Sequence, residues 1–212
     1  MNKVYEYIIN EYGYDEPVFS NDLREQLDMT DSAIRQSLRR LTEKGELLRV
    51  ENGIYYVPKK NSILGTPYVN LEKVVLRKYI KPIDCDVIGF TSGINFANQL
   101  GLTSQTASIN TIVTNRVKRT QHQEIGKKHV ILKCSKVQIT KKNYKILQVL
   151  NLLEDYNRIS ETSLDGASYA IKEYLSDVMI PSNEFNEYIK KFSKETVLRI
   201  METGLYSEFT QR

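Results

Sequence analysis

The chain has 212 residues, of which 41% are hydrophobic and 26% are charged, and its formal net charge is +4. These proportions are typical of a globular protein, and the length allows one large domain or two small ones. No apolar run approaches the ~20 residues that span a bilayer, and the N-terminus carries acids and tyrosines where a secretory signal would be apolar. We therefore expect a cytoplasmic protein without a membrane segment.

The first sixty residues follow the order of elements of a winged helix-turn-helix domain. The predicted order is helix, short extended segment, two helices and two strands, over residues 3–11, 17–19, 20–27, 31–44, 47–50 and 54–57. In the third helix, Ile34, Leu38 and Leu41 recur at the spacing of one buried face. Asn52-Gly53 between the two strands suits a tight turn with positive φ.

A second domain is predicted after a linker at 61–67, which contains Gly65 and Pro67 among polar residues. Its predicted helices are 71–79, 92–100, a segment from 141 onward, 167–174, 184–192 and 194–201, and its predicted strands are 86–90, 109–113 and 130–132. The predicted fold class is therefore α+β. A winged helix-turn-helix domain over 1–60 is followed by a mixed α/β domain with a helical C-terminus over 68–212.

The polar face of the helix over 31–44 carries side chains suited to reading DNA. With its apolar stripe turned inward, Ser32, Arg35, Gln36 and Arg39 project outward and Arg40 lies at the flank. An arginine can bind guanine through two hydrogen bonds and a glutamine can bind adenine in the same way, and an α-helix fits the major groove. We expect this helix to be a recognition helix.

The two strands after this helix are the expected wing. Arg49 and Asn52 are placed to meet the DNA backbone or the minor groove, and Lys59 and Lys60 follow as phosphate contacts. An alternative remains open for the whole domain. The arginines can instead form surface pairs along the helix, as Arg39 with Glu43, and winged helices also serve as protein-interaction or dimer modules.

The positive charge of the chain is concentrated in its middle. Residues 1–60 hold nine Lys/Arg and eleven Asp/Glu, a net of −2, residues 61–153 hold fourteen and four, a net of +10, and residues 154–212 hold seven and eleven, a net of −4. From Arg116 to Lys145 there are ten basic residues and one acid, Glu124. This imbalance favours a surface for nucleic acid or for an acidic partner. The expected phosphate contacts there are Arg116, Lys118, Arg119, Lys127 and Lys128.

Catalytic and metal-binding patterns are weak. Cys85 and Cys134 stand alone, and His122 and His129 are seven residues apart, so no metal or cofactor is implied. No nucleophile with an assignable base is present. A metal-dependent enzyme acting on nucleic acid remains an alternative through Asp84, Asp86 and Lys127, with Glu124 nearby in sequence, but this spacing is common by chance.

Three segments together resemble the AbiEi-type antitoxins of type IV toxin–antitoxin systems. They are GIYYVP at Gly53–Pro58, GINFANQLGLTSQ at Gly93–Gln105 and IVTN at Ile112–Asn115. The resemblance covers roughly residues 1–150, and the order of the motifs is more specific than any one of them. Thr106-Ala107 stands where many relatives have a proline, and the helical C-terminus matches only loosely.

The resemblance implies a non-enzymatic antitoxin and transcriptional autorepressor. Its winged helix would bind double-stranded operator DNA at inverted repeats, and its second domain would oppose a nucleotidyltransferase-like toxin without a stable complex and assist DNA binding. The resemblance assigns the DNA-facing role to Ser32, Arg35, Gln36 and Arg39. A dimer on DNA is considered because repressors usually bind such repeats as paired subunits, although no strong dimer helix is evident. A regulator without a toxin remains an alternative. Asn98 and Gln105 are interpreted as structural hydrogen-bonding residues.

Overall fold

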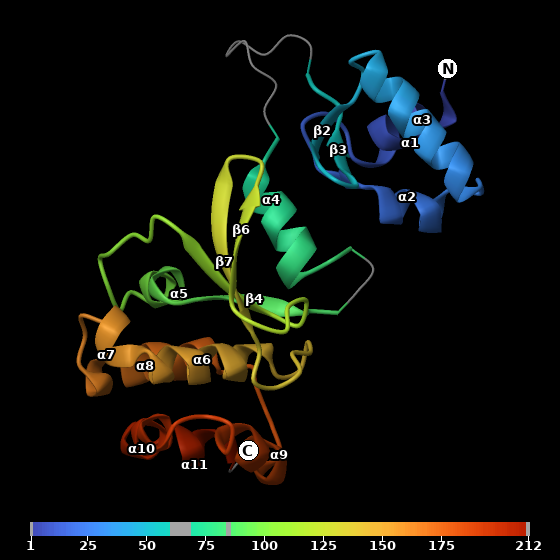
Figure 1. Ribbon diagram of the computed structural model, residues 1–212. Coiled ribbons are helices and arrows are strands. Elements are labelled where there is room, and N and C mark those ends of the chain that lie inside the picture. Colours follow the sequence, from blue (N-terminus) through green and yellow to red (C-terminus); the bar gives the residue numbers. More distant parts are fainter. Residues whose placement is uncertain (1, 60–68, 84–85, 211–212) are drawn as a thin grey trace. The chain divides into compact units, whose positions relative to one another are not determined.

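The computed structural model describes residues 2–59, 69–83 and 86–210 and has the expected mixed α and β architecture (Figure 1). The chain divides into two compact units. The first comprises Met1–Arg77 with Glu124–Lys128, and the second comprises Lys78–Gln123 with His129–Arg212. Lys60 and the predicted linker over 61–67 lie outside the described residues. In the described ranges, no helix has the length and apolar character needed to cross a membrane.

The first unit begins with helices and strands in the predicted order. They are α1 (Lys3–Glu11), β1 (Val18–Phe19), α2 (Ser20–Gln26), α3 (Asp31–Glu43), β2 (Leu48–Glu51) and β3 (Ile54–Tyr56). The strands form an antiparallel sheet in the order β1-β3-β2. Beyond residue 68, α4 (Leu71–Val75) continues into a π-helical turn, η1 (Leu76–Ile80). The sequence predicted one helix over 71–79.

Local sequence explains the position of α3. The Thr30 hydroxyl accepts a hydrogen bond from the backbone N–H of Ala33 and so caps the first turn. Ile34, Leu38 and Leu41 are buried in the core that includes residues of α1, which confirms the predicted apolar stripe. Burying this face turns the opposite face of α3 toward solvent.

Arg77 in η1 is fixed against the beginning of the same unit. Its guanidinium donates hydrogen bonds to the backbone oxygen of Pro17 and to the carboxylate of Asp22. It also lies 4.8 Å from the ring centroid of Phe19 and 5.4 Å from that of Tyr12. The mostly buried cation of Arg77 therefore attaches the beginning of η1 to the first unit.

The second unit contains a four-stranded sheet in the order β4-β5-β7-β6. Its elements before the C-terminal helices are β4 (Gly89–Ser92), α5 (Ile94–Gln99), β5 (Asn110–Thr114), β6 (Gln121–Ile125) and β7 (Lys128–Cys134), with the tip of the β6–β7 hairpin counted in the first unit. Strand β5 pairs antiparallel with β4 and parallel with β7. The strand predicted over 86–90 actually occupies Gly89–Ser92, and the helix predicted over 92–100 is correspondingly shorter.

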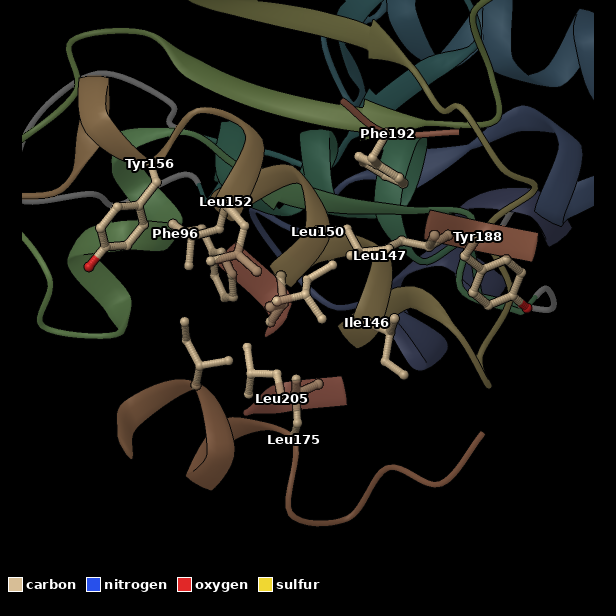
Figure 2. Close-up of a cluster of buried hydrophobic side chains, with 14 of the residues drawn as sticks. Phe96, Ile146, Leu147, Leu150, Leu152, Tyr156, Leu175, Tyr188, Phe192 and Leu205 are labelled. Atoms are coloured by element: carbon tan, nitrogen blue, oxygen red, sulfur yellow. The ribbon is translucent and has the colours of Figure 1, made fainter. Parts of the chain in front are cut away.

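Six helices complete the second unit: α6 (Tyr144–Glu154), α7 (Tyr156–Ile159), α8 (Leu164–Tyr174), α9 (Ser182–Ile189), α10 (Lys194–Glu202) and α11 (Leu205–Thr210). Helix α6 contacts β4 and α10. Its residues 146–150, 152 and 153 are all buried, so α6 is enclosed on every side. Figure 2 shows Ile146, Leu147 and Leu150 within the apolar cluster around this helix.

The backbone closes tightly around Gly89, and this position provides a test of the fold. An alanine Cβ at Gly89 would overlap the carbonyl oxygen of Tyr79 and lie 2.8 Å from that of Val113. We expect Gly89→Ala to lower the free energy of unfolding by ~3 kcal/mol, because two backbone segments would have to move. Urea denaturation followed by circular dichroism measures this change.

Gly101→Ala is the matched control for this experiment. Gly101 has a φ of +70° but no atom within 4 Å of an added Cβ, so the control carries only the conformational cost of about 1 kcal/mol. Equal destabilisation by the two substitutions would show that the close approach at Gly89 is not needed.

Candidate nucleic-acid interface

The outward face of α3 carries the polar side chains predicted to read DNA. Ser32, Arg35, Gln36, Arg39 and Arg40 are all exposed on this helix. Ser32 lies three residues before Arg35 and four before Gln36, and Arg39 lies four and three residues after these two, so the four share one side of the helix, with Arg40 beside them. The helix therefore presents arginine and glutamine side chains to solvent opposite its buried stripe.

The arginines of α3 already have acidic partners in the isolated chain. Arg39 Nε donates to Glu43 Oε1 at 2.8 Å, and this carboxylate raises the pKa of Arg39. Arg35 Nη2 lies 3.8 Å from Asp31 Oδ2, and its Nε donates to the Asp31 carbonyl oxygen at 3.2 Å. The surface pairing considered from the sequence is thus present. Because the side chains are largely exposed, such pairs contribute little and can exchange for another anion.

The turn of the β2–β3 hairpin holds the residues predicted for the wing. Arg49 Nη2 donates to Asn52 Oδ1 at 2.8 Å, and Arg49 Nε donates to the carbonyl oxygen of Glu51 at 3.2 Å. Gly53 has a φ of +78°, as the tight turn requires. Lys59 is exposed, and its backbone N–H donates to Asp15 Oδ1 at 3.1 Å. The exposed guanidinium of Arg49 is therefore held at the hairpin tip.

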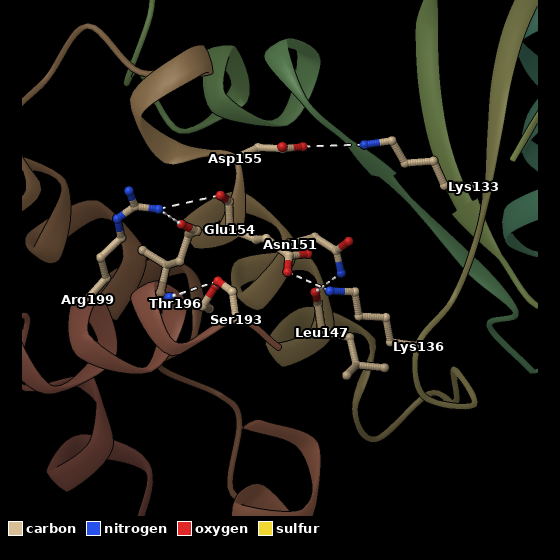
Figure 3. A network of polar contacts seen from close by, with 10 residues as sticks. Lys133, Lys136, Leu147, Asn151, Glu154, Asp155, Ser193, Thr196 and Arg199 are labelled. Carbon is tan, nitrogen blue, oxygen red and sulfur yellow. Dashed lines mark hydrogen bonds and ion pairs between the residues drawn. The ribbon is translucent and has the colours of Figure 1, made fainter. Parts of the chain in front are cut away.

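Four of the ten basic residues between Arg116 and Lys145 are neutralised by carboxylates from outside that stretch. The pairs are Lys128 with Glu72, Lys133 with Asp155 at 3.3 Å, Lys136 with Glu154 at 2.5 Å, and Lys145 with Asp177 at 2.5 Å. Figure 3 shows Lys133 directed at Asp155, beside the C-terminal end of α6. Burial lowers the pKa of Lys128, whose ammonium is less available to DNA than the sequence suggested.

The other six basic residues of this stretch are exposed and form no ion pair with the described residues of the chain. They are Arg116, Lys118, Arg119, Lys127, Lys141 and Lys142. We refer to the first three as the basic turn, because they lie between β5 and β6. Lys127 lies at the tip of the β6–β7 hairpin, in the first unit.

Asn115 connects the basic turn to the segment that carries Lys141 and Lys142. Its Nδ2 donates to the carbonyl oxygen of Ile139 at 2.9 Å, and its Oδ1 accepts from the Ile139 N–H at 3.0 Å. This double hydrogen bond holds two loops side by side. Asn115 ends the IVTN motif, and the sequence alone assigns it no role, since its partner lies 24 residues away.

The Gly93–Gln105 motif forms the turn at each end of α5. Asn98 Nδ2 donates to the carbonyl oxygens of Thr103 at 3.1 Å and Gln105 at 3.3 Å, and Gln105 Nε2 donates to Glu161 Oε1 at 3.2 Å. The structural role expected for Asn98 and Gln105 is confirmed. Ser104 donates its N–H and hydroxyl to Glu161 Oε2 at 2.8 and 3.0 Å, so the loop is bound to the segment before α8.

Little in the described residues resembles a metal or catalytic centre. No group of three His, Cys, Asp or Glu side chains in those ranges is arranged to hold an ion. Asp84 and Cys85 lie outside the described residues, and Asp86 and Lys127 belong to different units. Cys134 is an exposed free thiol.

The chain matches the family described as "Family of unknown function (DUF6088)" over residues 19–165. Because the match covers more than half of the chain, the protein belongs to this family. The matched range contains α3, the hairpin, the basic turn and the Gly93–Gln105 motif, and ends at the start of α8. Comparison with curated proteins gives no match.

The hydrogen bonds that Glu161 accepts predict how acid acts on the second unit. The backbone N–H of Ser104, then the Ser104 hydroxyl and the Gln105 amide, hold the pKa of Glu161 below its usual 4.5. A carboxyl whose folded-state pKa is depressed stabilises the fold above its unfolded-state pKa, and this contribution is lost as pH falls through the folded value. As the pH is lowered below 4.5, the free energy of unfolding of Glu161→Gln should therefore fall less than that of the wild type.

The measurement is the urea midpoint of both proteins from pH 7 to pH 3. Glu202→Gln is the matched control, because Glu202 is exposed and accepts no hydrogen bond from the described part of the chain. Identical pH profiles for wild type and Glu161→Gln would contradict the stabilising role of the charged Glu161.

Proposed function

We propose that this member of the DUF6088 family is a non-enzymatic antitoxin and transcriptional autorepressor. Its first unit would be a winged helix-turn-helix domain that binds operator DNA, and the protein would oppose a nucleotidyltransferase-like toxin. The observation that carries the DNA-binding half is the exposed arginine and glutamine face of α3, followed directly by an antiparallel hairpin. The antitoxin half is supported by the resemblance of three sequence segments to AbiEi-type antitoxins.

The arrangement of the first unit supports a winged helix. The order α1-β1-α2-α3-β2-β3 and the antiparallel pairing of β1 and β2 on either side of β3 are those of such domains. Helix α2 contacts α3, and α3 has thirteen residues, about 20 Å of helix at the usual rise. A helix of this length with one polar face can enter a major groove.

Base reading would occur by exchange of partners on α3. Arg35 and Arg39 leave solvent-exposed carboxylates of the same helix for the O6 and N7 atoms of guanine, and Gln36 pairs with adenine. The paired acids explain why residues 1–60 can carry a net charge of −2 and still serve this role. They lower the attraction to any phosphate backbone while leaving specific base contacts possible.

Phosphate contacts would come from both units. Arg49 at the hairpin tip and Lys59 after β3 are exposed in the first unit, and Lys60 is the next residue in sequence. The basic turn supplies three cations in the second unit that form no ion pair with described residues. We propose that α3 provides sequence preference while these cations provide much of the affinity.

Substitution of the two α3 arginines tests base reading. Arg35→Ala with Arg39→Ala should reduce the preference for operator over scrambled duplex by at least tenfold, because each bidentate contact contributes about 1–3 kcal/mol of discrimination. Fluorescence anisotropy with labelled DNA from upstream of the gene measures this ratio. Arg158→Ala is the control, since Arg158 is 67% exposed and also paired with an acid, Asp155.

A second set of variants separates base reading from phosphate binding in the same assay. Arg116→Gln, Lys118→Gln and Arg119→Gln together should weaken binding to operator and scrambled DNA alike. The slope of log affinity against log salt should fall by up to ~0.9 for each phosphate that the variant no longer neutralises. Unchanged binding in both sets of variants would exclude these two surfaces as the DNA interface.

Co-expression tests the antitoxin half. If a nucleotidyltransferase-like reading frame lies beside this gene, its expression should arrest growth, and this protein should restore growth. The α3 double variant should restore growth as well, because the opposing activity is assigned to the second domain. Repression of a reporter without any rescue of growth would instead identify a regulator that has no toxin.

A further inference from the structure

The second unit has an open hollow of about 510 Å³ beside the basic turn. Its lining includes Val117 and Lys118 between β5 and β6, Cys134 at the end of β7, and Val137 and Gln138 from the segment after β7. This volume lies within the ~300–1,000 Å³ typical of small-molecule sites. The hollow is large enough for a ligand of the size of a nucleotide.

The rim of the hollow is held in place by hydrogen bonds. Asn115, which lines the hollow, exchanges two hydrogen bonds with Ile139, the residue after the lining residue Gln138. The Ser135 hydroxyl donates to the Val137 carbonyl oxygen at 2.5 Å. The two segments are therefore fixed relative to each other before any ligand arrives. Such pre-organisation lowers the entropic cost of binding.

The chemistry of the lining favours an anion that also has an apolar, flat part. None of the described side chains that line it is acidic, and Lys118 is an exposed cation without an ion pair to described residues. Arg116 and Arg119 flank Lys118 in the sequence, and Lys141 and Lys142 follow the lining residue Gln138 by three and four positions. Val117 and Val137 supply apolar surface.

A polar group able to read a base edge completes the set. Gln138 is exposed at the hollow, and its side-chain amide offers both a donor and an acceptor. A phosphate needs cations, a nucleobase has two apolar faces, and its edge has donors and acceptors. All three requirements are met within one hollow.

We propose that this hollow is a nucleotide-binding site, with Lys118 on the phosphates, the base against Val117 and Val137, and Gln138 on the base edge. The nucleotide is either a free nucleoside triphosphate or the terminal nucleotide of a single strand. The site goes beyond the proposed function, because it does not require operator binding by α3. It would make the second unit responsive to nucleotides in its own right.

Calorimetric titration of the full chain tests the site. The probes are ATP, GTP, CTP and UTP, a single-stranded RNA twelve-mer, and inorganic tripolyphosphate. At least one nucleotide or the RNA should bind more tightly than tripolyphosphate. Lys118→Ala should weaken that binding about tenfold, the usual effect of one charge-assisted hydrogen bond. Lys194→Ala removes an exposed cation of α10 in the same unit and should leave it unchanged.

Alkylation of Cys134 provides an independent reading of the same site. Its thiol is exposed and Cys134 lines the hollow, so a bound nucleotide should slow the reaction of the thiol with iodoacetamide. Mass spectrometry of the Cys134 peptide measures the rate of this reaction. Protection by a free triphosphate identifies the soluble ligand, and protection by the RNA alone identifies a strand end.

The proposal is overturned if no nucleotide or RNA protects Cys134, if tripolyphosphate binds as tightly as the best nucleotide, or if Lys194→Ala weakens binding as much as Lys118→Ala. Operator binding, measured separately with the α3 variants, distinguishes failure of this site from failure of the proposed function. Gln138→Ala should change the preference among the four nucleotides without a change in melting temperature.

Discussion

The burial of α6 is the constraint on which the second unit depends. No residue of α6 is exposed, so the helix must be covered on every side, and β4 and α10 supply two of those surfaces. The C-terminal end of α6 is enclosed as well, so its last carbonyl oxygens need donors. The largely buried Arg199 of α10 donates to the carbonyl oxygen of Glu154 (Figure 3). It also donates to the carbonyl oxygen of Leu153 and to the carboxylate of Glu195. One side chain therefore provides donors for the last carbonyl oxygens of α6 and attaches α10 to that helix.

The position of α6 also determines which positive charges remain available. Glu154 and Asp155 at its end neutralise Lys136 and Lys133, and these carboxylates lie at the beginning of a segment that is acidic overall. The basic turn has no such partner among the described residues. The excess positive charge of the middle of the chain is thus concentrated by folding onto fewer residues than the sequence count suggests, and one of those residues, Lys118, lines the hollow.

Local patterns in the sequence predicted the helices and strands over residues 3–56 well, because short-range spacing decides them. The stripe of Ile34, Leu38 and Leu41 and the turn at Gly53 were predicted from neighbours within a few residues. The shift of the strand to Gly89–Ser92 was not predictable in this way, since it reflects the close approach of Tyr79 and Val113. The bond between Asn115 and Ile139 and the pairing of Lys133 with Asp155 join residues more than twenty positions apart. Residues so far apart in the sequence cannot be recognised as partners from a short stretch of the chain.

Arg199 lies beyond the last residue of the family match. The family match stops at residue 165, before α9, α10 and α11. A fragment cut at that boundary would keep α6 but lose the helix that covers it and the guanidinium bound to its final carbonyl oxygens. Leu150 and Leu153 would then meet water, and such a fragment would tend to aggregate. The segment that carries the family signature is therefore shorter than the segment that can fold, and the C-terminal helices belong in any minimal form of this protein.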